Sequence, residues 1–80
     1  MEKYKIKYKL RLNSPSLFAL RDLISRDEYL GDNGFCDEDN ILHAELYLKH
    51  NTNPLNYVNG NINEILLDDE QILSSECFQI

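Results

Sequence analysis

Five cationic side chains occupy every second position near the start of the chain: Lys3, Lys5, Lys7, Lys9 and Arg11. On one face of a strand such side chains lie about 6.6 Å apart, close to the phosphate spacing of a nucleic-acid strand. The row is therefore a candidate nucleic-acid surface. We favour a plain solvent-facing row that deters edge pairing and forms cross-strand pairs with acids such as Glu45. No aromatic residue interleaves with these cations to stack bases.

Acidic residues form a second candidate surface. The net charge is −6, with five cations against one acid in residues 1–11 and three cations against thirteen acids in the rest. Such an exterior favours docking on a basic partner, or it only keeps the loops solvated. The two acidic clusters are Asp27, Glu28, Asp32, Asp37, Glu38 and Asp39, and then Glu64, Asp68, Asp69 and Glu70.

Two tyrosines are candidates for the same partner-binding surface. Tyr47 alternates with charged residues, and Tyr57 lies beside asparagines in an expected turn. Exposed tyrosines next to acids are typical of binding hot spots. The predicted partner-binding residues are Asp32, Asp37, Glu38, Asp39, Tyr47, Tyr57, Asp68, Asp69 and Glu70.

Residues for catalysis or metal binding are few and badly spaced. Cys36, Cys77, His43 and His50 form no CxxC or HxxxH pair, so we predict no metal site and no cofactor. A Cys36–His43 nucleophile pair is conceivable, but His43 fits an exposed strand position better. We expect two free thiols and no catalytic residue, and hence no enzyme.

Alternation defines two strands around one helix. Residues 3–12 and 41–49 alternate with period two, with Tyr4 and Tyr8 on the inner row of the first strand. Ser14 suits an N-cap and Pro15 suits the first helical position, and an apolar stripe predicts a helix over 15–29 that stops at Gly31. Residues 31–34 read as a turn, 35–36 as a short strand or loop anchor, and 37–40 as an acidic loop.

Residues 55–71 are ambiguous. Asn59-Gly60 fits a hairpin turn, whereas Asn61 and Glu64 fit a helix start. Asp68, Asp69 and Glu70 would crowd the end of such a helix, so we favour strand. With a closing strand over 72–80, the fold class is α+β. The order is β-α-β-β-β, and one helix packs on one face of an antiparallel or mixed sheet.

Length and composition bound the kind of protein. The 80 residues form a single domain, 1–80, and 42% hydrophobic with 28% charged residues argues against disorder. No apolar run approaches a membrane span, and the first residues lack the apolar centre of a secretion signal. We therefore expect a cytoplasmic protein, or one in the host cell cytoplasm if it is phage-encoded.

These patterns predict a small, acidic, non-catalytic inhibitor or regulator that binds a protein with a basic surface. In size, charge and missing catalytic motifs the chain is similar to small acidic proteins of phages and mobile elements, including anti-CRISPR and other anti-defence inhibitors, and to toxin-immunity proteins. The likeness covers no aligned motif and implies no site residues. The alternative is a nucleic-acid-binding module that uses Lys3–Arg11. Pairing through a sheet edge would give a homodimer.

Overall fold

A computed structural model describes all 80 residues. Four strands and two helices follow one another in the order β-α-β-β-α-β. In chain order they are β1 (Glu2–Arg11), α1 (Ser14–Ile24), β2 (Tyr29–Cys36), β3 (Ile41–His50), α2 (Leu55–Ile65) and β4 (Gln71–Gln79). Neither helix is long and apolar enough to cross a membrane.

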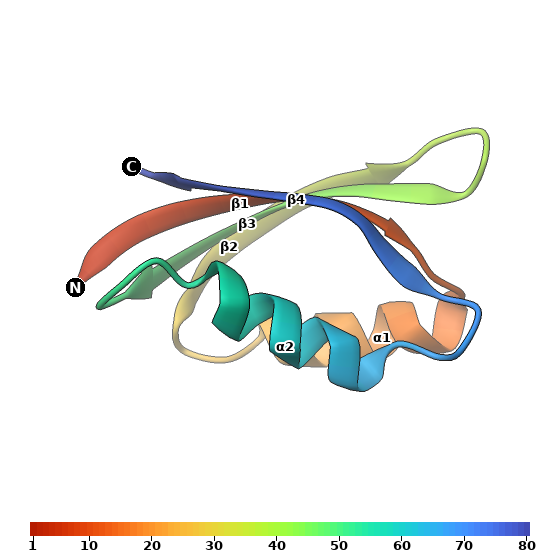
Figure 1. Cartoon of the computed structure of the whole chain (residues 1–80), viewed down its shortest axis with the longest axis horizontal. Helices are drawn as coiled ribbons and strands as arrows, with labels where there is room; N and C mark the ends of the chain where they lie inside the picture. The colour runs from red at the N-terminus through yellow and green to blue at the C-terminus, as the bar shows by residue number, and fades with distance from the viewer.

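The four strands form one antiparallel sheet in the order β2-β3-β1-β4. Each helical connection passes over one intervening strand, so two β-α-β units interleave in the arrangement called ferredoxin-like or split β-α-β. Both helices lie on the same face of the sheet, and the opposite face is open (Figure 1). This agrees with the expected α+β class and with helical packing on one face of an antiparallel sheet. The expected single helix is replaced by a pair.

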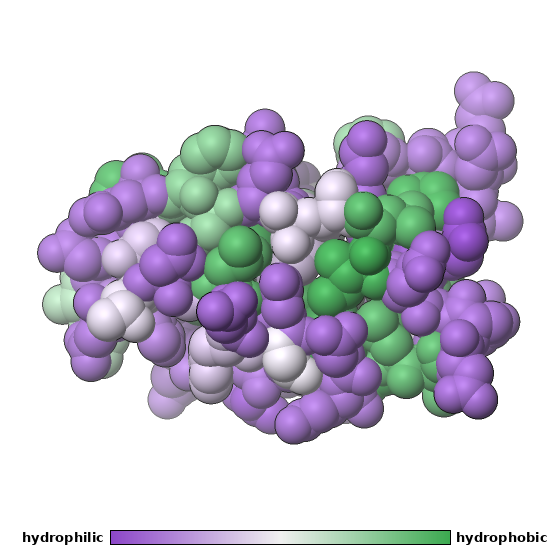
Figure 2. Space-filling view, viewed as in Figure 1, coloured by the Kyte–Doolittle hydropathy of each residue, from purple (hydrophilic) through white to green (hydrophobic).

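The core lies between the sheet and the two helices. The inner rows of β1 and β3 are buried as expected, with Ile6, Leu10 and Leu48 fully enclosed. From the helices, Leu20, Leu23, Val58 and Ile62 pack against these rows. Hydrophobic residues are visible at mid-height, in the region where α2 faces the sheet, with hydrophilic residues above and below them (Figure 2).

Helix α1 is shorter than the stripe predicted. It starts at Ser14 with Pro15 in its first turn, as expected, but Asn13 takes the N-cap position in place of Ser14. It ends at Ile24, where the Ser25 hydroxyl donates to the Asp22 carbonyl at 2.7 Å. The expected extension to Tyr29 is wrong, because Tyr29 is buried as the first residue of β2.

The turn expected at residues 31–34 is also wrong, because these residues lie inside β2. A Cβ atom at Gly34 would lie 2.8 Å from the His43 carbonyl oxygen, so glycine lets β2 approach β3 closely. The chain reverses instead in the expected acidic loop, 37–40. The Asp37 N–H donates to the Ile41 carbonyl at 3.0 Å, and Asn40 adopts a φ of 62°, which Asn tolerates.

The strand favoured for residues 55–71 is wrong, because residues 55–65 form α2 and a turn follows them. The buried stripe of α2, Leu55, Val58, Ile62 and Ile65, has helical spacing. Burying one such side chain stabilises the fold by about 1.5–3 kcal/mol, whereas a helical glycine costs about 1 kcal/mol. Gly60 therefore stays in the helix, on its exposed side.

The helix start considered at Asn61 is too late, and the acidic residues 68–70 follow α2 rather than ending it. The closing strand is confirmed as β4, shifted by one residue from the expected 72–80. Its pairing with β1 shifts register between Lys9 and Leu10.

Candidate functional site

Side chains on the open face line up in rows across the four strands, because paired residues of neighbouring strands share a face. Odd-numbered residues of β1 and β3 point to this face, away from the buried even-numbered ones. The three central rows, written from β2 to β4, are Phe35, His43, Lys9 and Ser74; Asn33, Glu45, Lys7 and Glu76; and Gly31, Tyr47, Lys5 and Phe78.

The cations of this face have no carboxylate partner. The one ion pair in the structure joins His43 and Asp37, at 2.8 Å. Lys7 has Glu45 and Glu76 in register on its two sides, yet neither lies within 4.0 Å of its ammonium group. The Tyr47 hydroxyl donates to Glu45 at 2.7 Å, which raises the pKa of Tyr47 and holds that carboxylate along β3. The expected cross-strand pairing of Lys7 with Glu45 is therefore present in register, but it forms no ion pair.

Aromatic rings from the strands on either side of β1 flank the cations. The Lys5 and Lys7 ammonium groups lie 5.6 and 5.9 Å from the centroid of the Phe78 ring. On the other side Phe35 stacks on His43, with centroids 4.8 Å apart and planes 8° from parallel. Phe35 remains 63% exposed and Phe78 43%. The expectation that no aromatic residue interleaves with the cations is correct for β1 alone. It is wrong for the assembled face.

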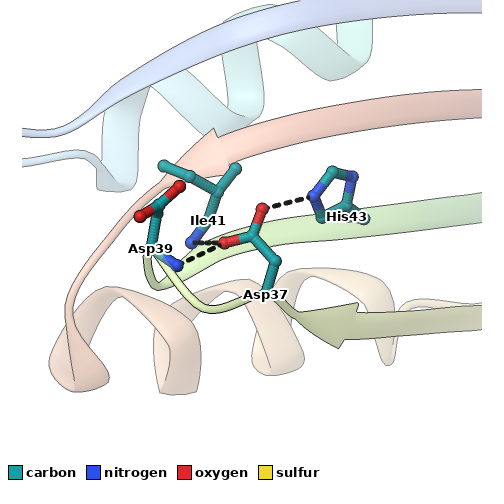
Figure 3. A network of polar contacts seen from close by, with 4 residues as sticks. All are labelled: Asp37, Asp39, Ile41 and His43. Atoms are coloured by element: carbon teal, nitrogen blue, oxygen red, sulfur yellow. Dashed lines mark hydrogen bonds and ion pairs between the residues drawn. The ribbon is translucent and has the colours of Figure 1, made fainter.

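Asp37 fixes the position of His43 (Figure 3). One of its carboxylate oxygens lies 2.8 Å from His43 Nε2, and the other accepts from the N–H groups of Asp39 and Ile41. The hydrogen bond with His43, followed by that from Ile41, lowers the pKa of Asp37. This predicted partner-binding carboxylate is thus occupied within the β2–β3 hairpin, where it holds the imidazole beside Phe35.

Glu70 is likewise occupied inside the fold. It is 7% exposed and accepts from the Ser16 hydroxyl and from the N–H groups of Asn13 and Leu67. These bonds, that of Ser16 first, lower the pKa of Glu70. The carboxylate joins the start of α1 to the turn before β4, and it lies where a helix dipole favours an anion.

Four other predicted acids, Glu38, Asp39, Asp68 and Asp69, are exposed at one end of the molecule. The register explains this, since Arg11 at the end of β1 pairs with the first residues of both β3 and β4. We call these four residues the acidic end. Asp32 is exposed on β2, opposite Leu46.

The two candidate tyrosines do not form one patch. Tyr47 belongs to the open face, whereas Tyr57 lies on α2, where its hydroxyl donates to Glu28 at 3.0 Å. The Tyr57 ring also stacks on His50, with centroids 5.1 Å apart. Tyr57 is therefore engaged on the helix side of the sheet.

The structure brings together no nucleophile and base. Cys36 pairs with Leu42, on the helix side of the sheet, whereas the adjacent His43 belongs to the open face. Both cysteines are free, and burial raises the pKa of Cys77. No group of three or more His, Cys, Asp or Glu side chains is placed to hold a metal ion.

The open face thus carries excess positive charge on a protein of net charge −6. Lys49 lies beside Lys3 on the same face, whose carboxylates are Glu45 and Glu76, with Asp37 paired to His43 at its edge. Three comparisons with known proteins, by family model, by curated sequence and by solved structure, give no match. The function is therefore inferred from the residues of the site themselves.

Proposed function

We propose that this protein is a non-catalytic binding module that holds single-stranded nucleic acid on the open face of its sheet. The observation that carries the proposal is the row of unpaired cations flanked by the exposed rings of Phe35 and Phe78. Basic surfaces with interspersed aromatic rings bind single strands through phosphate contacts and base stacking. A four-stranded sheet with exposed aromatic residues is one such surface.

Several features favour a single strand over a duplex. The bases of a single strand are free to stack on side chains, whereas those of a duplex are stacked on one another. The acidic end repels a polyanion, so contact is favoured on the open face. We therefore expect modest affinity that weakens steeply with salt, because each phosphate contact releases a counterion.

The direct test measures the fluorescence anisotropy of a labelled mixed-sequence DNA oligomer during protein titration at several salt concentrations. We expect binding at low salt, and a loss of more than about tenfold for a Lys5→Glu, Lys9→Glu double variant. Each lost lysine should lower the salt slope by about one. The matched control is Arg21→Glu, Arg26→Glu, which makes the same charge change away from the open face.

Two results would reject this function. One is the absence of binding at low salt. The other is equal weakening by the two double variants, since that would reflect the global charge alone.

A second function is favoured by the gathering of Glu38, Asp39, Asp68 and Asp69 at one end of the molecule. Four exposed carboxylates there form a surface that a basic, nucleic-acid-binding protein would accept in place of nucleic acid. Under this proposal the protein is a cytoplasmic inhibitor or regulator, of the anti-defence or toxin-immunity kind.

The acidic end is tested by a pull-down from a bacterial lysate treated with nuclease. A basic partner should be retained by the wild-type protein and by Lys5→Glu, Lys9→Glu. It should be lost when the four carboxylates are replaced by Asn or Gln. Retention by that quadruple variant would exclude the acidic end as the docking surface.

A further inference from the structure

A groove of about 300 Å³ crosses the open face between the outer strands. Its volume is at the lower end of the range for small-ligand pockets, so it suits a group the size of one nucleotide. Every strand contributes to the lining, which includes Lys7, Lys9, Phe35, His43, Glu45 and Glu76. The groove therefore combines cations, an aromatic pair and two carboxylates within one small site.

Two carboxylates in the groove supply hydrogen-bond acceptors on both sides of Lys7. Glu45 and Glu76 stand on the two sides of Lys7 in register, and neither is ion-paired to it. An ionised carboxylate only accepts hydrogen bonds. A base that enters the groove is thus met by acceptors on both sides of a central cation.

We infer that the groove selects bases that carry an exocyclic amino group over thymine and uracil; this inference rests on the proposed binding of single-stranded nucleic acid. The amino groups of cytosine and adenine donate to a glutamate. Thymine and uracil carry a carbonyl oxygen where cytosine carries its amino group, and this oxygen would face a carboxylate. Selection then comes from repulsion of the wrong base as well as from attraction of the right one.

The other lining residues complete one nucleotide subsite. Lys7 and Lys9 supply charge for the phosphate, and the exposed Phe35 ring offers a face for the base. Asp37 holds the imidazole of His43 against Phe35, so the aromatic pair is already ordered before a ligand arrives. Such preorganisation reduces the entropy cost of binding.

The test compares short labelled oligomers of deoxycytidine, deoxyadenosine and thymidine by fluorescence anisotropy at low salt. We expect the first two to bind about five- to tenfold more tightly than the thymidine oligomer. In a Glu45→Gln, Glu76→Gln double variant this preference should disappear. A glutamine amide both donates and accepts, and it keeps an acceptor for the Tyr47 hydroxyl.

The matched control is Asp39→Asn, Asp68→Asn, which makes the same charge change at the acidic end. It should strengthen the binding of all three oligomers alike and leave the preference intact. Equal or tighter binding of the thymidine oligomer to the wild-type protein would overturn the selection but leave the proposed function standing. A preference that survives in the double glutamine variant would remove the glutamates as its cause. Absence of all binding would reject the proposed function, and this inference with it.

Discussion

The two faces of β1 lie in opposite environments, one buried and apolar, the other exposed and cationic. On the helix side Tyr4, Ile6, Tyr8 and Leu10 are buried among the residues of the core. On the open side the cations are held by no ion pair and remain available to solvent. Because side chains alternate along a strand, one segment supplies both the centre of the core and the centre of the binding surface. Stability and binding should therefore respond to substitutions at neighbouring positions independently.

The largest expected effect is a difference in stability between substitutions at two adjacent residues of β1. Ile6→Ala removes a fully buried side chain, so the free energy of unfolding should fall by about 2–5 kcal/mol. Lys7→Ala should change it by no more than about 0.5 kcal/mol. Urea unfolding followed by circular dichroism measures both. A similar loss in the two variants would show that the open face is not energetically separate from the core.

The next effect concerns binding. Phe78→Ala removes an exposed ring beside Lys5 and should weaken single-stranded DNA binding by about 1–3 kcal/mol for each stacked base, with little change in stability. Phe18→Ala is the control, because Phe18 is also exposed, at 64%, and lies on α1 with Arg21 near its ring. If both variants bind DNA alike, the aromatic residues of the open face have no special role.

A smaller effect distinguishes two buried tyrosines of the core. The Tyr8 hydroxyl donates to Asn59 at 2.6 Å, whereas the Tyr29 hydroxyl is buried without a hydrogen-bond partner. Tyr8→Phe should lower the free energy of unfolding by about 1 kcal/mol, and Tyr29→Phe should raise it by up to about 1 kcal/mol. Urea midpoints that shift in the same direction would contradict this difference.

Alkaline unfolding gives a second measurement of the same pair. Burial raises the pKa of Tyr29 to about 12 and that of Tyr8 still further, and the nearby Asn61 amide opposes the shift of Tyr29 only in part. The neutral phenols are thus favoured in the folded protein. Their contribution is complete below the ordinary tyrosine pKa of 10.0 and is lost as the pH rises through the folded values. Tyr29→Phe should therefore reduce the sensitivity to alkali.

The smallest effect lies at the edge of the open face. Because the folded pKa of Asp37 is below its ordinary 3.8, its stabilisation is present above that pH and is lost as the pH falls through the folded pKa. Asp37→Asn should lower the melting temperature by a few degrees at most at neutral pH. The difference from the wild type should vanish in strong acid. A gap that persists there would indicate a role other than charge.

The strands β1 and β3 were predictable from sequence because each packs one face on the core over ten residues, which enforces strict alternation. The predictions are wrong at positions where tertiary packing overrides local turn signals. Gly31 and Gly34 read as a turn, yet β3 needs a closely packed partner along that edge. Asn59-Gly60 reads as a hairpin, yet the stripe around it must cover the sheet.

The binding surface was predictable only in part. The cation row follows from alternation within one strand, whereas its aromatic neighbours come from β2, β3 and β4. Their positions depend on strand order and register, which one sequence does not specify. Alternation in the closing segment, with Cys77 inward and Phe78 outward, was the available signal for Phe78. Nothing local distinguishes the buried Glu70 from the exposed Asp68 and Asp69.

The pairing of the first strand with the last one has a consequence for biosynthesis. Tyr4 lies opposite Gln79, so one side of β1 stays without its partner until the residues of β4 have left the ribosome. Contacts between such distant positions form slowly, because the entropy of closing a long loop is lost before they are gained. Until then the nascent chain exposes an unpaired edge at the middle of its future sheet, and such an edge makes the unfinished fold prone to aggregation.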